Sequence, residues 1–489
     1  MLPVLVLLAQ VTLPGTKPLA PMEDPARAMV DGLHAYLEDR HAIAATQRAV
    51  ATPTPELLRE VLGIPAESRA AKLPAVVQGA RFRIAVEPGF EATGTVQGPD
   101  VDAQCYAIHL GIRQFTTPDC LTFQLMVLDR AVEFSGNAAI GKKAVLEHRE
   151  FIYRMAYPMG IHPLGLDVRK VRAVVDYFQT LPAKQIRLVA AQDEDAMLTG
   201  LLACVIDARI ENCRLVGPEL SLDRLDTHPV DHNLWRFSAH FDLTVLKRLM
   251  EPRVLTLVAR KPNQRVAPAM RREEFEQYVN LIQRRVREAG KQRPAWFAGQ
   301  TLEQAREVFA RDLVGVFSEE LEAFAGRVEV RPRYQEAAFT GYEVKIPVAK
   351  QVFAYGHLLI PKNLKPGERR ALVVAQHGLE GRPEYTIERE KERIVYDQFA
   401  AKMAQQGFIV YAPQNPYTHG DHFRMVQRKA NPLGMSLYTF ITAQHRQTLN
   451  WLETLPFVDR ERMGFYGLSY GGRTAMMVPP VEPRYRVVV

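Results

Sequence analysis

The stretch MGFYGLSYGGRT, residues 463–474, holds a serine with a glycine two positions away on either side. Gly467, Ser469 and Gly471 form the pattern GxSxG, which follows the strand-like run RMGFYG and precedes the helix-like run GRTAMMV. A sharp strand-to-helix turn strains such a serine, and glycine is needed on both sides because larger side chains would collide. The hydroxyl is then exposed at a helix N-terminus, whose partial positive charge favours a developing oxyanion. We therefore predict that Ser469 is a catalytic nucleophile.

A second stretch supplies the other half of a predicted oxyanion-binding site. In RRALVVAQHGLEGRP, residues 369–383, an apolar strand runs into a loop that begins with His377 and Gly378. The predicted donors to the tetrahedral oxygen are the backbone N–H of Tyr470, the residue after the serine, and that of Leu379 in this loop. A histidine here more often orients its loop than acts as a base, so we predict an orienting role for His377.

No metal or cofactor site is predicted from the sequence. The polar turn THGDH, residues 418–422, offers several ligand types, but such turns are usually solvated loops. The four cysteines, Cys105, Cys120, Cys204 and Cys213, show no metal-ligand spacing. Cys204 and Cys213 lie in apolar runs typical of buried thiols. Cys105 and Cys120 can pair in an oxidising compartment, and the sequence leaves their pairing open.

At these residues the sequence resembles the α/β-hydrolase superfamily, and within it the bacterial acetyl xylan esterase and dienelactone hydrolase-like group. The resemblance is carried by VVAQHGLEG, FAAKMAQQGFIVYAPQ and GFYGLSYGGRTAM, and it covers residues 342–489. It implies serine hydrolase chemistry on ester substrates, with Ser469 in the nucleophile position and residues 377–381 as the oxyanion loop. More faintly, HREFIYRMAYPMGIHPLGLDVRKV and IDARIENCRLV in the first half resemble a helix and a strand of a related hydrolase domain.

The elements that position these residues follow a plan that recurs in the chain. PLGLDVRKVRAVVDYFQTLP, residues 163–182, is echoed by PLGMSLYTFITAQHRQTLNWLETLP, residues 432–456, and each pairs a helical pattern with a following strand. Two further pairs of α/β segments match in the same order. The sequence therefore predicts an α/β fold of tandem hydrolase-like domains with mostly parallel sheets, related by an old duplication.

The first copy departs from the catalytic pattern. Aligning IRLVA with MGFYG places Ala190, Gln192 and Glu194 opposite the serine motif, with Gln192 at the position of Ser469. A glutamine cannot be acylated and regenerated as a serine can, and the loss of both glycines removes the reason for a sharp turn. We predict that the first domain is catalytically inactive.

The predicted boundaries follow from this repeat. The charged amphipathic run MRREEFEQYVNLIQRRVREAGKQ, residues 270–292, is the natural linker between the copies. The first nine residues, MLPVLVLLA, resemble the apolar region of a secretory leader, which favours a secreted or periplasmic protein, or a cytoplasmic one if the leader is not cleaved. The predicted parts are a signal peptide at 1–20, a degenerate hydrolase-like domain at 21–268, a helical linker at 269–298 and a hydrolase domain at 299–489.

The acid and the histidine that would activate the serine are expected outside the given sequence. In the α/β-hydrolase superfamily, which the sequence resembles, the acid and the histidine each follow a strand that comes after the serine in the chain. The first copy continues to a late strand, PRVLTLVARKP at residues 252–262, whose counterpart is expected beyond Val489. His377 and His419 follow strands on the correct side of such a sheet and stay open as substitutes, although neither is the favoured base. We therefore predict that the second domain is incomplete at its C-terminus.

Bulk properties exclude several classes of protein. A chain of 489 residues suits two or three domains, and 47% apolar with 24% charged residues is typical of a globular protein. The 62 basic and 55 acidic side chains form no basic block, so no nucleic-acid partner is expected. The apolar leader is too short to span a bilayer. The oligomeric state is not indicated by the sequence.

The leading prediction is an acetyl xylan esterase-like hydrolase that acts on a small-molecule or carbohydrate ester through an acyl-enzyme at Ser469. A peptidase of the prolyl oligopeptidase type shares the GLSYGG turn, but such enzymes carry a β-propeller, and the first half of this chain shows no repeats of propeller period. The third interpretation is a catalytically inactive binding protein, because the triad acid and histidine are not found in the chain.

Overall fold

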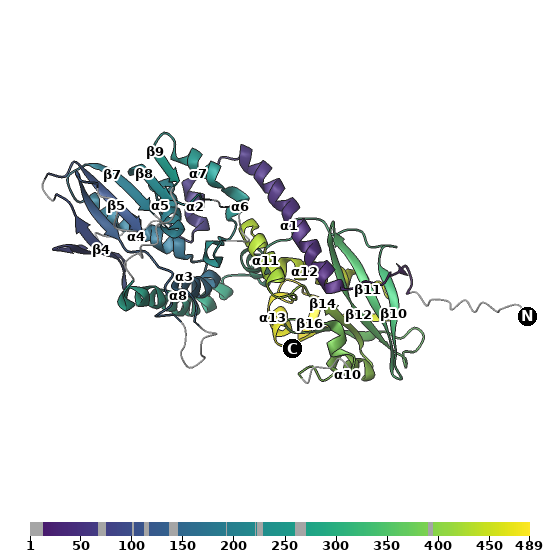
Figure 1. The fold of residues 1–489 in the computed structure, drawn as a ribbon. Helices are drawn as coiled ribbons and strands as arrows, with labels where there is room; N and C mark the ends of the chain where they lie inside the picture. The colour runs from purple at the N-terminus through teal and green to yellow at the C-terminus, as the bar shows by residue number, and fades with distance from the viewer. Residues whose placement is uncertain are drawn as a thin grey trace, which may run out of the picture. The chain divides into compact units, whose positions relative to one another are not determined.

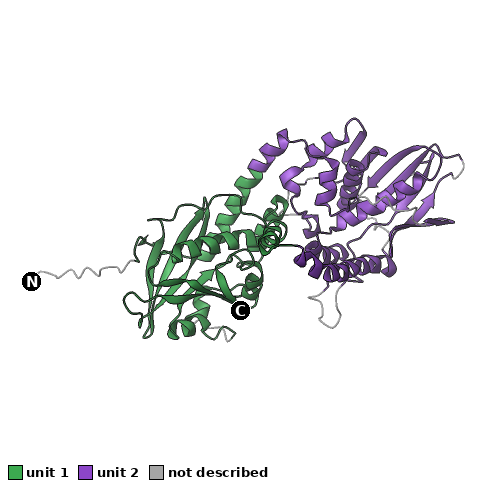
Figure 2. Cartoon of the chain, turned by 180° about the vertical axis from the view of Figure 1, so that it is seen from behind, with its two compact units in different colours: residues 1–42, 300–489 green, residues 43–299 purple. Residues whose placement is uncertain are grey.

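The computed structural model contains two compact units (Figure 2). Unit 1 consists of Met1–Ala42 and Gln300–Val489, and unit 2 of Ile43–Gly299. The residues that the structure describes are 13–66, 75–99, 102–111, 117–135, 145–191, 193–220, 222, 228–259, 270–389 and 395–489.

Unit 1 is built on an eight-stranded sheet with the order β1-β10-β11-β12-β14-β13-β15-β16 (Figure 1). Strands β10, β11, β12 and β14 pair antiparallel, whereas β14, β13, β15 and β16 pair parallel. Strand β14, which joins the antiparallel and the parallel part of the sheet, has the sequence IVYAPQ. It is buried along its whole length, as expected for a strand covered on both faces. The strands are β1 (Lys17–Pro18), β10 (Glu329–Gln335), β11 (Phe339–Ala349), β12 (Val352–Pro361), β13 (Arg370–Gln376), β14 (Ile409–Gln414), β15 (Val458–Gly467) and β16 (Tyr485–Val488).

The chain order of these strands reverses at β13. From β13 the chain moves to β14 on one side, then crosses back to β15 on the other side. In α/β sheets, ligands bind at the carboxyl ends of the strands where the order reverses. The helices of this unit are α1 (Pro25–Val50, of which residues 25–42 belong to unit 1), α9 (Leu302–Phe309), α10 (Phe399–Gln405), α11 (Asp421–Ala430), α12 (Leu437–Leu452) and α13 (Tyr470–Met477).

The N-terminal part of the chain belongs to the unit that contains Ser469. Val30, Leu33 and Leu37 of α1 are fully buried in the same core as Val344 and Ile346 of β11. The predicted first domain, 21–268, includes residues 21–42, which the structure assigns to unit 1. The difference arises because the apolar side of α1 packs on the sheet of unit 1.

Residues 1–12 of the predicted signal peptide lie outside the described residues. The rest of that segment contacts unit 1, since β1 pairs in parallel with Glu329 and Val330 of β10. Cleavage after residue 20 would therefore remove a strand from this sheet. Within the described part of the chain, no helix is both long and apolar enough to cross a bilayer.

Unit 2 repeats the same sheet plan. Its strand order is β2-β3-β4-β6-β5-β7-β8-β9, and the order and sense of pairing from β2 to β8 match those from β10 to β16 (Figure 1). The prediction of an α/β fold with two hydrolase-like, mostly parallel sheets is confirmed. The strands are β2 (Ala75–Gln78), β3 (Arg81–Glu87), β4 (Phe90–Gln97), β5 (Cys105–Gly111), β6 (Cys120–Leu125), β7 (Gln185–Ala191), β8 (Ile210–Gly217) and β9 (Val254–Ala259).

The helix expected to link the two domains is an integral part of unit 2. Tyr278 of α8 is fully buried, and its hydroxyl donates a hydrogen bond of 2.7 Å to Asp167 of α4. Glu274 of the same helix accepts one of 3.1 Å from Thr93 of β4. The apolar and polar groups on one face of α8 thus complete the core. The helices are α2 (Pro55–Val61), α3 (His148–Ala156), α4 (Pro163–Phe178), α5 (Glu194–Ile206), α6 (Phe237–His240), α7 (Leu243–Met250) and α8 (Arg272–Ala298).

The cysteines all lie in unit 2. Cys105 and Cys120 face each other as register partners in the parallel pair β5–β6 and form a disulfide. Cys204 and Cys213 are buried free thiols, as their apolar surroundings in the sequence indicate.

Candidate active site

Ser469 lies at a sharp turn between β15 and α13. The strand ends at Gly467, the helix begins at Tyr470, and Ser469 caps the helix with φ 56° and ψ −115°. A positive φ is rare for a residue with a side chain, and it costs about 1–3 kcal/mol that the surrounding structure must offset. Ser469 is exposed at the surface of the unit. The turn therefore holds an accessible hydroxyl in a strained backbone at the N-terminus of a helix.

The two flanking glycines lie where no side chain fits. A Cβ atom added to Gly467 would lie 2.2 Å from the carbonyl oxygen of Gly471. A Cβ atom added to Gly471 would lie 2.7 Å from the carbonyl oxygen of Gln376 and 2.8 Å from that of His377. Because these neighbours are backbone atoms, they cannot move aside as a flexible side chain would. Glycine at 467 thus lets the turn close on its own backbone, and glycine at 471 lets it approach the end of β13.

The loop after β13 lies against the serine. A Cβ atom added to Gly378 would lie only 3.3 Å from the Cβ of Ser469, so the loop leaves little room for a side chain at this position next to the serine. The N–H of Gly378 donates to the hydroxyl of Tyr396 at 2.9 Å and is therefore occupied. The N–H groups of Leu379 and Tyr470, in contrast, have no backbone or side-chain acceptor among the described residues. Both N–H groups are thus free to donate to another acceptor, and that of Tyr470 directly follows the serine in the chain.

Both ring nitrogens of His377 are used to shape this loop. The N–H of Asn415 donates to Nε2 at 3.2 Å, so Nε2 is the unprotonated nitrogen, and Nδ1 donates to the carbonyl oxygen of Gly378 at 2.7 Å. The ring is fully buried, and this burial lowers the pKa of His377 to about 4. At neutral pH the side chain is a neutral imidazole that holds the loop.

Two residues that the sequence analysis did not single out complete this support. The hydroxyl of Tyr417 donates to the carbonyl oxygen of His377 at 2.7 Å, and it accepts from the side chain of Asn415 at 3.1 Å. Both residues are buried. The only sequence signal for them is their place directly after the apolar strand IVYAPQ, at the edge of the sheet where ligands bind.

The turn at residues 418–422 is more ordered than the sequence suggested. We expected a solvated loop, but Thr418 is buried, and the backbone N–H groups of His419 and Gly420 donate to the carboxylate of Glu380 at 2.8 and 2.9 Å. The turn is held in place because Glu380, in the loop after β13, provides a carboxylate that these two backbone donors share. The turn therefore packs against the loop that contacts Ser469.

Neither histidine that was left open as a base contacts the serine within the described residues. His377 is engaged on both nitrogens. His419 Nε2 lies 3.3 Å from the guanidinium of Arg382 and 3.3 Å from the carboxylate of Asp24. The structure places Gly378 next to Ser469 and Tyr470, and Leu379 follows Gly378 as an exposed residue. Among the described residues, no imidazole contacts the serine hydroxyl.

Unit 2 has a different turn at the matching place in its sheet. Strand β7 ends at Ala191 and α5 begins at Glu194, so the residue that corresponds to Ser469 is the helix cap Asp193 rather than Gln192. Gln192 itself lies outside the described residues. Asp193 has ordinary extended angles, φ −117° and ψ 150°, and accepts a capping hydrogen bond from the N–H of Ala196 at 2.6 Å. A normal N-cap replaces the strained turn in this unit.

Comparison with known proteins gives limited matches. No family model and no curated protein matches the chain. Among solved structures, a putative acetyl xylan esterase from Bacteroides fragilis NCTC 9343 is 16% identical, with a TM-score of 0.32, over 38% of this chain and 50% of that chain. A glucuronoyl esterase from Solibacter usitatus is 13% identical, with a TM-score of 0.31, over 39% and 57%. Acetyl xylan esterase 1 from Thermoanaerobacterium sp. JW/SL YS485 is 15% identical, with a TM-score of 0.27, over 38% and 62%.

The chain thus spans between half and about three fifths of the length of these solved structures. The similarities are weak, and each neighbour's name describes that neighbour alone. The hydrolase-like fold of unit 1 follows from its own strand order and from the strand-turn-helix at Ser469.

Proposed function

We propose that unit 1 is a serine hydrolase that cleaves carboxylic esters through an acyl-enzyme at Ser469. The observation that carries the proposal is the strained, exposed turn at Ser469, which is followed directly by the N–H of Tyr470, a group without an acceptor in the described residues. The backbone of Ser469 stores strain because a residue with a side chain is held at positive φ at the helix N-terminus. Asp193, the helix cap at the matching place in unit 2, has extended angles and lacks this strain.

The proposed reaction has two steps. The Ser469 oxygen attacks the ester carbonyl carbon, the hydroxyl proton passes to a base, and the carbonyl oxygen becomes an oxyanion that accepts hydrogen bonds from Tyr470 and Leu379. The tetrahedral intermediate collapses, and the alcohol leaves with a proton. Water then attacks the acyl carbon, the bond to the Ser469 oxygen breaks, and the carboxylic acid leaves as a proton returns to the serine oxygen. The proposal assigns the nucleophile and the oxyanion donors, and it assigns no base.

The substrate class is a small-molecule or carbohydrate ester. The motifs around Ser469 and residues 377–381 resemble those of acetyl xylan esterases, and small acetate esters are therefore the first substrates to test. The full-length protein should hydrolyse p-nitrophenyl acetate, and an alkyl fluorophosphonate should label it at Ser469, as located by mass spectrometry of the labelled peptide.

Matched variants make the test specific. Ser469→Ala should reduce ester hydrolysis to the background rate and abolish labelling, whereas Ser318→Ala, the same change elsewhere in unit 1, should leave both unchanged. Labelling or hydrolysis that persists in Ser469→Ala would contradict the proposal. Cleavage of an X-Pro peptide without cleavage of acetate esters would favour the peptidase interpretation, and failure of both activities in the folded wild-type chain would favour a binding protein.

A further inference from the structure

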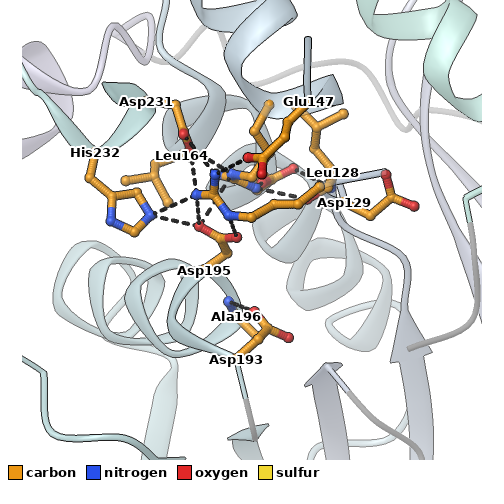
Figure 3. A network of polar contacts seen from close by, with 12 residues as sticks. Leu128, Asp129, Glu147, Leu164, Asp193, Asp195, Ala196, Asp231 and His232 are labelled. Atoms are coloured by element: carbon orange, nitrogen blue, oxygen red, sulfur yellow. Dashed lines mark hydrogen bonds and ion pairs between the residues drawn. The ribbon is translucent and has the colours of Figure 1, made fainter. Parts of the chain in front are cut away.

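Unit 2 contains a network of buried ion pairs at the carboxyl ends of its parallel strands (Figure 3). Arg130 makes two hydrogen bonds of 2.7 Å to Asp195 and two of 3.0 Å to Asp231. Arg149 is fully buried and donates to Asp231 at 2.8 Å. Two guanidinium groups meet four carboxylates here, so the network as a whole is acidic. The guanidinium groups are those of Arg130 and Arg149, and the carboxylates are those of Glu147, Asp167, Asp195 and Asp231.

His232 extends this network with one of its two ring nitrogens. Its Nε2 lies 2.6 Å from a carboxylate oxygen of Asp195, and Figure 3 shows the ring beside that carboxylate. A carboxylate accepts only, so Nε2 carries a proton, and in the neutral ring Nδ1 carries a lone pair. Arg130 lies 3.3 Å from the same Nε2, but its guanidinium already donates to Asp195 and Asp231. The ion network thus selects the tautomer of His232.

Among the residues that the structure describes, Nδ1 of His232 has no hydrogen-bond partner. The side chain is 3% exposed, and Nδ1 is buried without a hydrogen-bond donor among the described residues. A buried acceptor without a donor is unfavourable, and a bound ligand would satisfy it. The histidine lies at the end of the short helical turn Val230–His232, which follows β8.

Two further donors lie close to His232. Nε2 of His228 lies 3.6 Å from a carboxylate oxygen of Glu194, and the rings of His228 and His232 are 5.8 Å apart at nearly a right angle. Glu194, His228 and His232 each offer one ligand atom, and these atoms all lie within 4.8 Å of one another. Glu194 is the first residue of α5. It lies at the carboxyl end of the sheet of unit 2, and Ser469 lies at the corresponding end of the separate sheet of unit 1.

We propose that Glu194, His228 and His232 bind a divalent transition-metal ion, with Zn²⁺ the best fit to the donors. Two imidazoles and one carboxylate form a ligand set that suits zinc and leaves a fourth position for water or another molecule. Asp195 then acts as the outer carboxylate that fixes the ring of a metal-binding histidine, an arrangement typical of protein metal sites.

The surroundings favour a dication. The nearby ion network has more carboxylates than guanidinium groups, and Glu194 adds a further negative charge outside it. Asp195, which contacts His232, also lines a cavity of about 220 Å³ together with Gly111, Leu128 and Asp193. Unit 2 lacks the strained serine turn, and this site gives it a function that does not depend on the proposed hydrolase activity of unit 1.

The test measures metal binding by the purified full chain. Metal-free protein should take up about one Zn²⁺ per chain on equilibrium dialysis, and Co²⁺ in its place should give the visible absorption of a low-symmetry site with nitrogen ligands. Glu194→Gln and His228→Gln should each weaken Zn²⁺ binding tenfold or more. Both side chains lie at the edge of the unit, with exposed fractions of 30% and 12%, so these variants should keep the fold, as checked by circular dichroism.

A matched histidine provides the control. His240→Gln, in the same unit but outside this cluster, should bind Zn²⁺ like the wild type. No stoichiometric Zn²⁺ uptake by the folded wild-type chain would overturn the proposal. Uptake that is unchanged in both cluster variants, or that falls equally in His240→Gln, would show binding elsewhere and would also overturn it.

Discussion

Acidification should release the loop beside Ser469, because His377 can hold it only as a neutral ring. The pKa of His377 is lowered from 6.5 to about 4 by burial. Each pKa unit corresponds to 1.36 kcal/mol, so the shift is equivalent to about 3 kcal/mol of stability. The sign follows from the direction of the shift: the unfolded chain binds the proton more tightly. This contribution is therefore complete above pH 6.5, decreases as the pH falls, and is almost entirely lost near pH 4.

The protonated ring also breaks a specific contact. Nε2 accepts from the N–H of Asn415 at 3.2 Å, and it cannot accept once it carries a proton. The expected result is that unit 1 loses both stability and reactivity of Ser469 toward fluorophosphonate over this pH range. The glutamine side chain of a His377→Gln variant does not titrate, so this variant should lack that part of the pH dependence.

The assay compares the urea-unfolding free energy of wild type and His377→Gln at several values between pH 7 and pH 4. Burial also lowers the pKa of His109, His162 and His445. Because both proteins contain these histidines, the difference between the two unfolding free energies removes the pH dependence that they contribute. The difference should change by about 3 kcal/mol across the range. A difference in unfolding free energy that does not change with pH would refute the reasoning. So would an NMR signal of His377, identified by its absence from the variant, that titrates near pH 6.5 in the wild type.

Three other changes test the structure. Gly467→Ala places a Cβ atom 2.2 Å from a backbone oxygen, so it should cost about 1–3 kcal/mol in thermal unfolding and reduce serine labelling; full labelling would argue against the tight turn. Arg149→Met leaves Asp231 buried without one of its cations and should destabilise unit 2 by about 3–5 kcal/mol in urea unfolding, and a loss below 1 kcal/mol would contradict this. Reduction of Cys105–Cys120, which closes a loop with a sequence separation of 15, should lower the unfolding free energy by about 3 kcal/mol, and a midpoint insensitive to reductant would show that the bond does not form.

The features that the sequence predicts well are local ones. The turn at Ser469 is encoded within residues 462–478 by a strand pattern, two glycines and a helix pattern, and the structure has that order of elements. The shared sheet plan is also visible locally, as repeated helix and strand segments. Periodicity does not indicate which sheet an amphipathic helix covers, however. Leu33 and Leu37 of α1 pack with unit 1, and Tyr278 of α8 packs within unit 2, and neither partner could be inferred from spacing alone.

The polar clusters were missed for a related reason. Arg130 and Asp195 are 65 residues apart, and Arg149 and Asp231 are 82 residues apart. Charged residues usually lie at the surface, so the sequence gives no reason to bury these four together. The sequence also does not indicate that His228 and His232 lie close to Glu194. They come together because β8, which precedes the two histidines, pairs with β7, which precedes Glu194.

The division of unit 1 into two separated segments affects how the protein is made. Unit 2 is continuous in sequence, so it can complete its core while the ribosome still synthesises the rest of the chain. The apolar stripe of α1 must wait for β11, which emerges about 300 residues later, or roughly 15–60 s at common rates of synthesis. During that interval Val30, Leu33 and Leu37 form an unprotected surface on the nascent chain, where chaperones would be most needed.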